Sequence, residues 1–212
     1  PLYVDSTLNG YPVIRFDGVN NNFMLGSHYL FADNTKTGIT FIAVVKSTAD
    51  RTYTLANLLD FGTPEAGLGG YVFEYDINDA GSLWHKPGVY DYGRVTYSHS
   101  KGSAYVIYTG VIKFGVAGYS TNVVRLNGAQ VVSSTSSYAL TQFTAAEIDE
   151  SATRTGSSGP VSIAMQSKLL NTTRNLQGDI AEMLWYSSAL SSTDAHTIEA
   201  FLGQKYGITL DQ

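Results

Sequence analysis

Short runs of β-branched and aromatic residues, which alternate with polar residues and break at Gly, Asn or Ser, recur along this chain. Residues 12–17 alternate in this way, and so do residues 71–77. Residues 40–45 are almost continuously apolar, which is typical of a strand that is covered on both faces. This pattern predicts an all-β fold built from many short strands.

The composition agrees with this prediction, because the chain has 21 Gly, 15 Tyr and 9 Phe but only 15% charged residues. Aromatic and β-branched side chains suit pleated, half-buried surfaces, and Gly suits the turns between strands. Further strands are predicted at residues 104–108, 111–116, 161–165 and 179–186. We therefore expect a two-sheet antiparallel β-sandwich of the jelly-roll type, whose common interior contains Ile14, Phe16, Ile180 and Leu184. A length of 212 residues is enough for one sizeable core, so residues 1–212 are expected to form a single domain.

Two local signals are sharper than the rest. Asn127-Gly128 separates two β-prone runs, and both residue types tolerate the positive φ that a tight type I′ hairpin requires. Near the end of the chain, Ser191 is suited to cap a helix whose apolar face carries Ala195, Ile198, Leu202 and Tyr206. Gly207 follows where a left-handed cap would end that helix. The sequence thus predicts one short C-terminal helix, laid on an edge of the sandwich.

Charge and composition exclude several kinds of partner and chemistry. The net charge is −5, so the chain lacks the basic surface that nucleic-acid binding normally needs. No apolar run approaches the ~20 residues of a membrane-spanning helix. The absence of Cys excludes disulfides, thiolate metal sites and a cysteine nucleophile. The chain opens on Pro1 without a leader, as expected of a processed chain or an excised piece.

Three segments carry a resemblance to a known group of domains. They are Leu126-Asn127-Gly128, NGYPVIRFDGVN at residues 9–20, and the C-terminal stretch with LQGDIAEMLWY at residues 176–186 and IEAFLGQKYG at residues 198–207. The chain resembles the concanavalin A-like, laminin-G-like jelly-roll lectin domain superfamily. That resemblance implies the sandwich fold, and it implies a structural role for Asp179 and Glu182, which would hydrogen-bond loop amides or the helix start. Members of the superfamily serve as lectins, adhesins, virion modules and appendages of enzymes.

Some relatives are glucanases that present three carboxylates on one face of a strand. Here Glu147, Asp149 and Glu150 invite the comparison, but Ser151 and Ala152 stand where the third carboxylate would have to be. We interpret this stretch as a solvated acidic loop, so no catalytic residue is assigned. The four histidines match no zinc motif, and a Ser/His/Asp triad assembled from distant segments is left open.

A cation site is the first candidate binding feature. Asp76, Asn78 and Asp79 begin like a calcium loop, because Ca²⁺ prefers clustered oxygen ligands. Ala80 and Pro87 occupy positions where an EF-hand needs ligands, so the loop is not an EF-hand. Two interpretations stay open: a simple calcium site at these three residues, or an Asx-type turn that ends a strand.

An aromatic segment is the second candidate feature. Sugar recognition generally combines an aromatic plate with polar groups that bind hydroxyls. We expect the densest such segment to form a rim loop or a short hairpin. An alternative is that its Trp84 closes the core. The segment contains Trp84, His85, Tyr90, Asp91, Tyr92 and Arg94, with Tyr97 following.

These observations predict a non-enzymatic recognition or adhesion module at an extracellular, cell or virion surface. Its expected partner is a glycan or a neighbouring surface protein, with Ca²⁺ as the one cofactor considered. Two alternatives are a structural decoration or fibre domain of a virion or cell surface, and a glycan-cleaving enzyme of the same fold. The sequence does not specify an oligomeric state.

Overall fold

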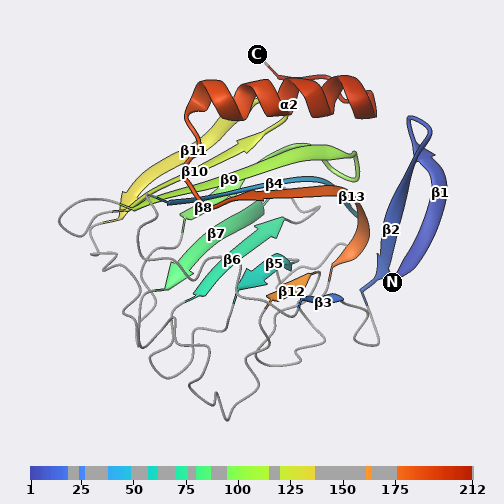
Figure 1. Cartoon of the computed structure of the whole chain (residues 1–212), viewed down its shortest axis with the longest axis horizontal. Helices are drawn as coiled ribbons and strands as arrows, with labels where there is room; N and C mark the ends of the chain where they lie inside the picture. Colours follow the sequence, from blue (N-terminus) through green and yellow to red (C-terminus); the bar gives the residue numbers. More distant parts are fainter. Residues whose placement is uncertain are drawn as a thin grey trace, which may run out of the picture.

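A computed structural model describes residues 1–18, 24–26, 38–48, 57–61, 70–75, 80–86, 95–114, 120–136, 161–163 and 176–211 of the chain. The described strands form two antiparallel sheets that stack on each other, and helix α2 (Ser192–Tyr206) lies on the outer side of the larger sheet (Figure 1). The predicted fold class, an all-β sandwich with one C-terminal helix, is confirmed.

The larger sheet has seven strands. Their spatial order is β1 (Leu2–Leu8), β2 (Tyr11–Asp17), β13 (Gln177–Tyr186), β4 (Gly38–Ser47), β9 (Val106–Phe114), β10 (Ser120–Leu126) and β11 (Ala129–Ser136). The last strand of the chain, β13, therefore lies between β2 and β4. Residues 104–116, which we predicted to form a pair of strands or one bent strand, contribute the single strand β9.

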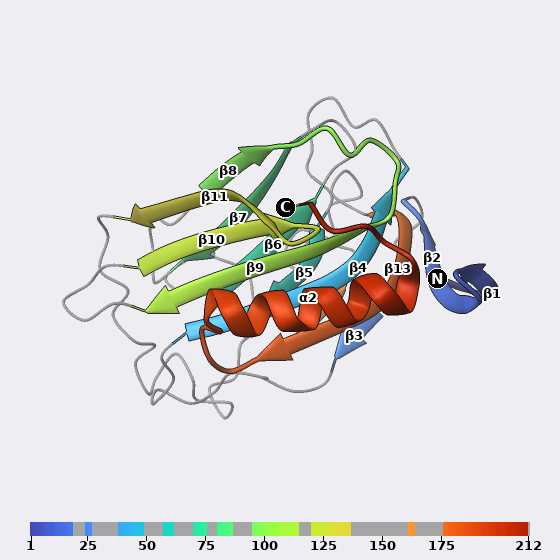
Figure 2. The ribbon, with the colours of Figure 1, turned by 90° about the horizontal axis from the view of Figure 1, so that it is seen from above.

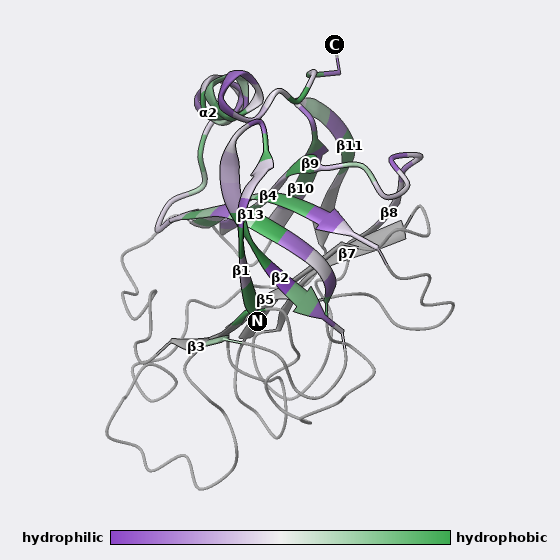
Figure 3. Ribbon diagram, turned by 90° about the vertical axis from the view of Figure 1, so that its right-hand side faces the viewer, coloured by the Kyte–Doolittle hydropathy of each residue, from purple (hydrophilic) through white to green (hydrophobic). Residues whose placement is uncertain are grey.

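The smaller sheet has six described strands, in the order β3 (Met24–Gly26), β12 (Val161–Ile163), β5 (Asn57–Phe61), β6 (Gly70–Tyr75), β7 (Ala80–Lys86) and β8 (Val95–Ser98). Its edge strand β8 lies beside β11, the edge strand of the larger sheet. Figure 3 shows the layers from the side, with α2 on one side of the larger sheet and β3, β5 and β7 on the other.

The main core lies between the two sheets. It contains buried side chains from both, including Phe16, Phe41 and Tyr108 of the larger sheet and Tyr97 of the smaller one. Every residue of β4 except Lys46 is fully buried. The prediction of a strand covered on both faces is therefore confirmed.

A second cluster explains where the helix sits. Ile42 and Val44 of β4 and Ile107 of β9 face away from the inter-sheet core, and they pack against Leu202 and Tyr206 of α2. Figure 2 shows the helix running across the middle of the larger sheet. Our expectation of a helix on an edge of the sandwich was wrong, because the outer sides of two central strands are apolar and need cover.

The ends of the helix were predicted correctly. The side-chain oxygen of Ser191 accepts a hydrogen bond from the backbone N–H of Asp194 at 3.1 Å. Gly207 adopts a left-handed conformation, with φ of 66°, and its N–H donates to the carbonyl of Gly203. The Asn127-Gly128 hairpin is also confirmed, because both residues have positive φ, at 48° and 88°.

A bulge in β13 changes which side chains face inward. Ile180 pairs with Val45 and Glu182 pairs with Val44, so Ala181 is an extra residue on this strand. Ile180 accordingly belongs to the core between the sheets, whereas Leu184 packs against the cluster under the helix. Our prediction that Leu184 shares an interior with Ile14, Phe16 and Ile180 was wrong for this reason.

Candidate functional site

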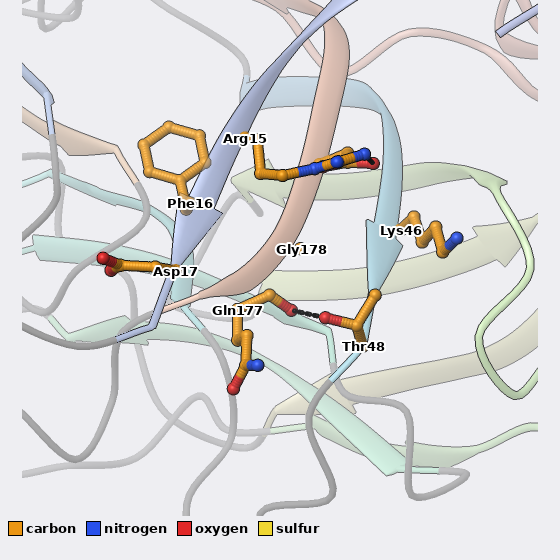
Figure 4. Close-up of a pocket in the computed structure, with 8 residues that line it drawn as sticks. Arg15, Phe16, Asp17, Lys46, Thr48, Gln177 and Gly178 are labelled. Atoms are coloured by element: carbon orange, nitrogen blue, oxygen red, sulfur yellow. Dashed lines mark hydrogen bonds and ion pairs between the residues drawn. The ribbon is translucent and has the colours of Figure 1, made fainter. Parts of the chain in front are cut away.

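Three charged residues form a row across neighbouring strands of the larger sheet. Asp179 of β13 lies opposite Arg15 of β2 on one side and opposite Lys46 of β4 on the other. Residues directly opposite each other in antiparallel strands point to the same face. Here that face is the outer one, which α2 covers further along the same strands. Figure 4 shows Arg15 and Lys46 extending from the ribbon, and the ring of Phe16 on the other side of β2.

Arg15 and Asp179 form a bidentate ion pair. The Nε atom of Arg15 donates to Oδ1 of Asp179 at 2.7 Å, and Nη2 donates to Oδ2 at 2.9 Å. The hydroxyl of Tyr105 donates to the same Oδ2 at 2.5 Å. The Asp179 side chain is only 2% exposed, whereas that of Arg15 is 47% exposed. The carboxylate is thus held from two sides, while the guanidinium stays in reach of solvent.

The pKa values of this group follow from its hydrogen bonds. Burial opposes ionisation of Asp179, but the hydrogen bonds from Arg15 and Tyr105 outweigh it and lower the pKa of the carboxyl. The bonds to Asp179 raise the pKa of the Arg15 guanidinium. Burial, together with the hydrogen bond to Asp179, raises the pKa of the Tyr105 hydroxyl. At neutral pH, Asp179 is therefore ionised and Tyr105 is protonated.

Lys46 is held differently from Arg15. Its ammonium nitrogen lies over the ring of Tyr105, 5.3 Å from the centroid, which is within the range of a cation–π contact. No carboxylate among the described residues lies within ion-pair distance of Lys46. Its positive charge still contributes to the lowered pKa of Asp179. One ring, Tyr105, therefore supports Lys46 through its face and Asp179 through its hydroxyl.

The backbone next to this row is closely packed. A Cβ atom on Gly178 would lie 1.9 Å from the carbonyl oxygen of Lys46, so only Gly allows β13 to approach β4 here. The N–H of Thr48 donates to the carbonyl of Gln177 at 2.8 Å, and the Thr48 hydroxyl donates to the same oxygen at 3.2 Å (Figure 4). These bonds fix the ends of both strands.

The row borders a surface pocket of about 420 Å³ at the end of β2, β13 and β4. Small-molecule sites in proteins typically range from about 300 to 1,000 Å³. The pocket is open to solvent and combines cations, carboxylates, an amide and a hydroxyl, from Arg15, Phe16, Asp17, Lys46, Thr48, Gln177, Gly178 and Asp179. Such a lining can hydrogen-bond a polar ligand at several points.

The carboxylates of the pocket do not suit glycoside hydrolysis. In most glycoside hydrolases that reaction uses a protonated carboxylic acid and a second carboxylate on opposite sides of the scissile bond. Asp179 is held ionised by Arg15, and the Asp17 carboxylate points away from the Arg15 side chain (Figure 4). Within the described part of the chain, no group of three or more His, Asp or Glu residues is placed to hold a metal ion. The geometry of this pocket is suited to binding.

Most of the predicted aromatic segment lies outside the described residues, including Tyr90, Asp91, Tyr92 and Arg94. Trp84 and His85 are part of strand β7, where they pair with Val72 and Tyr71 of β6. We expected a rim loop or a short hairpin at this point, and β7 pairs antiparallel with the next strand, β8, as in a hairpin. Tyr97 is 6% exposed and belongs to the core between the sheets.

The other predicted sites are only partly covered by the structure. Asp76, Asn78 and Asp79 lie outside the described residues, as does the acidic stretch at residues 147–150. His196 is exposed on α2, as expected of a surface residue. The calcium and aromatic sites therefore stay predictions.

Glu182, which the resemblance links to the helix start or to loop amides, instead contacts the end of the helix. It accepts hydrogen bonds from Nζ of Lys205 and from the hydroxyl of Tyr206, both at 2.8 Å. Asp179 likewise binds the side chains of Arg15 and Tyr105 rather than loop amides. The partners of both residues therefore differ from those that the resemblance implied.

Sequence reasoning did not identify Arg15, Lys46 and Tyr105 as site residues. A usable signal was present for Lys46, which is the one charged residue of β4 and lies near its end, whereas Arg15 shares β2 with a second charged residue, Asp17. The pairing of β2, β13 and β4, which brings residues 15, 179 and 46 together, is a long-range property. Tyr105 lies just before β9 and carries no local signal.

Comparisons with known proteins place the fold among lectin-like sandwiches. No family model and no curated protein matches the sequence. Among solved structures, the CBM40 of the Ruminococcus gnavus IT-sialidase, bound to α2,3 sialyllactose, superposes with a TM-score of 0.56 at 11% identity. The match covers 93% of this chain and 98% of that one. A heptameric SAP-like pentraxin from Limulus polyphemus matches with a TM-score of 0.50 at 12% identity, over 77% of this chain and 70% of that one.

A sialidase structure also matches most of this chain, but the match covers only a small part of the sialidase itself. The NanB sialidase of Streptococcus pneumoniae, as its K499G mutant, has a TM-score of 0.59 at 14% identity, and the match covers 87% of this chain. This chain spans only 27% of that sialidase's length. At these identities the likeness shows the lectin-like β-sandwich fold alone. None of the helices in the described part of the chain is long and apolar enough to cross a membrane.

Proposed function

We propose that this chain is a non-enzymatic, glycan-binding module whose 212 residues act as one domain. The observation that carries the proposal is the match, over nearly the full length of both chains, to a carbohydrate-binding module that was solved with α2,3 and α2,6 sialyllactose. Because glycans are displayed on exterior surfaces, the proposal places the module outside the cell or on a cell or virion surface.

The pocket beside Arg15, Asp179 and Lys46 is our first candidate for the binding site. Its size suits a small polar ligand, and its hydrogen-bonding groups come from fixed strand ends rather than from long loops. The aromatic segment that includes Trp84 and Tyr92 is the second candidate for the binding site. Calcium bound at Asp76, Asn78 and Asp79 is a further proposal, so binding has to be measured both with and without calcium.

A glycan array probed with and without calcium tests the function, and a hydrolysis assay on each bound glycan tests for turnover. We expect binding without turnover. Gln177→Ala should weaken binding at the pocket, whereas Gln130→Ala, which removes an exposed amide on β11, should leave it unchanged. Loss of binding in Trp84→Ala alone, with the fold intact by circular dichroism, would move the site to the aromatic segment.

Two results would contradict the proposed function. Turnover of a bound glycan would make the chain an enzyme. Silence on the array under both calcium conditions would favour a structural role in a surface assembly instead.

A further inference from the structure

The lining of the pocket holds two cations and two carboxylates, but these four charges are not paired equally. Asp179 uses both carboxylate oxygens on Arg15 and Tyr105, so its negative charge is already neutralised by one guanidinium. The Asp17 carboxylate points away from Arg15 (Figure 4). The row of Arg15, Asp179 and Lys46 therefore carries one positive charge in excess, and that charge is on Lys46.

The position of Lys46 is fixed without a counter-ion. Tyr105 is anchored by its hydrogen bond to Asp179, and the ammonium of Lys46 lies over its ring. A cation–π contact orients an ammonium but leaves its N–H donors available to a ligand. Lys46 is also part of the pocket lining, so these donors can reach a bound molecule.

Arg15 can assist Lys46. Its Nε and Nη2 atoms bind Asp179, while its Nη1 atom makes no hydrogen bond among the described residues. Because its side chain is 47% exposed, the remaining N–H donors of the guanidinium are accessible from solvent. Because Asp179 lies between Arg15 and Lys46 in the row, a ligand above it would meet the remaining donors of Arg15 on one side and those of Lys46 on the other.

The excess charge is local. The chain as a whole has a net charge of −5, so it repels anions at long range. An anion that binds here must be held by short-range contacts with this pocket, not by a general basic surface. Such contacts give selectivity for one substituent on a ligand.

We propose that Lys46, with Arg15 beside it, makes this pocket selective for saccharides that carry a single anionic substituent, a carboxylate or a sulfate. The proposal rests on the glycan-binding function proposed above and specifies its ligand class. Lys46 is the specificity-determining residue, and the Asp179–Tyr105 pair is the support that positions it.

Three probes that share one disaccharide test this selectivity: lactose, sialyllactose and sulfated lactose. We expect both acidic probes to bind the wild-type chain at least tenfold more tightly than lactose by calorimetry. Lys46→Ala should weaken the acidic probes about tenfold, so that they lose their advantage over lactose, whereas Lys46→Arg should retain acidic binding within threefold. Lys113→Ala, which removes an exposed charge on β9, is the matched control and should have no effect. Raising the salt concentration should weaken only the acidic probes.

Equal affinity for lactose and both acidic probes, or unchanged acidic binding in Lys46→Ala, would overturn the selectivity while leaving glycan binding intact. If no glycan binds, the proposed function fails. Titration with inorganic sulfate, followed by the backbone amide signals, then tests separately whether the pocket binds an anion. Shifts in the backbone amide signals of Lys46, Thr48 and Gln177 would support anion binding, and their absence would refute it. Binding of one acidic probe but not the other assigns the substituent.

Discussion

Arg125 of β10 and Glu199 of α2 form a buried ion pair that fastens the helix to the larger sheet. The Nε atom of Arg125 lies 2.9 Å from Oε1 of Glu199, and the Glu199 side chain is fully buried. A second guanidinium nitrogen of Arg125 donates to the carbonyl of Gly128 in the hairpin turn. The helix, a strand and a turn therefore meet at one charge pair.

Removing one partner of this pair should be costly. Glu199→Ala leaves the Arg125 guanidinium buried without a counter-ion, and we expect a loss of about 3–5 kcal/mol in the free energy of unfolding. Gln204→Ala, at an exposed position on the same helix, should change stability by less than about 0.5 kcal/mol. Urea denaturation followed by tryptophan fluorescence measures both. A cost for Glu199→Ala no larger than the control would show that the pair is unimportant for stability.

The close approach of β13 and β4 makes Gly178 sensitive to substitution. Gly178→Ala would place a methyl group 1.9 Å from the Lys46 carbonyl, so the strands must separate, at a cost of about 3 kcal/mol. Gly10→Ala is the control, because no atom lies within 4 Å of its Cβ position and only its positive φ opposes the change, at about 1 kcal/mol. Thermal unfolding ranks the two variants, and equal losses would contradict the close-packing argument.

The lowered pKa of Asp179 predicts a loss of stability in acid. A carboxyl whose pKa is lower in the folded than in the unfolded chain stabilises the fold above about pH 4, and this contribution disappears as pH falls through the folded value. Asp179→Asn should therefore cost about 1–3 kcal/mol at pH 7 and progressively less at lower pH. Denaturation midpoints measured from pH 7 to pH 2 check the trend.

Tyr105→Phe provides the second test of this group. It removes one hydrogen bond to Asp179, so the pKa of the carboxyl should rise towards its usual value. The acid loss of stability should then begin at a higher pH than in the wild-type chain. An unshifted acid transition in this variant would mean that the Tyr105 hydroxyl does not stabilise the ionised carboxylate.

The helix start gives a prediction of smaller size. Ser191→Ala removes the oxygen that accepts from the N–H of Asp194, and we expect a loss of about 1 kcal/mol. Ser192→Ala, one position later and also exposed, should be nearly neutral. Ser191→Asn should restore most of the stability. Equal effects of the two alanine variants would argue against the cap.

The features that sequence reasoning predicted well are those encoded by neighbouring residues. Asn127-Gly128 sets its own backbone conformation, and Ser191 and Gly207 mark the helix ends through local hydrogen bonds. The features that it missed depend on distant pairing. The bulge at Ala181 is visible only in the register with β4, and residues 15, 46 and 179 meet only because β13 inserts between two earlier strands.

The extra residue in β13 also affects how this strand can evolve. Before Ala181 the inward-facing positions have even numbers, as at Ile180, and after it they have odd numbers, as at Met183. Deleting Ala181 would straighten the strand but leave Met183 opposite Ala43 on the inner face and Leu184 opposite Ile42 on the outer face. One residue can therefore be lost at the bulge without exchanging the two faces, so the spacing between Asp179 and Trp185 is expected to vary by one residue among chains with this fold.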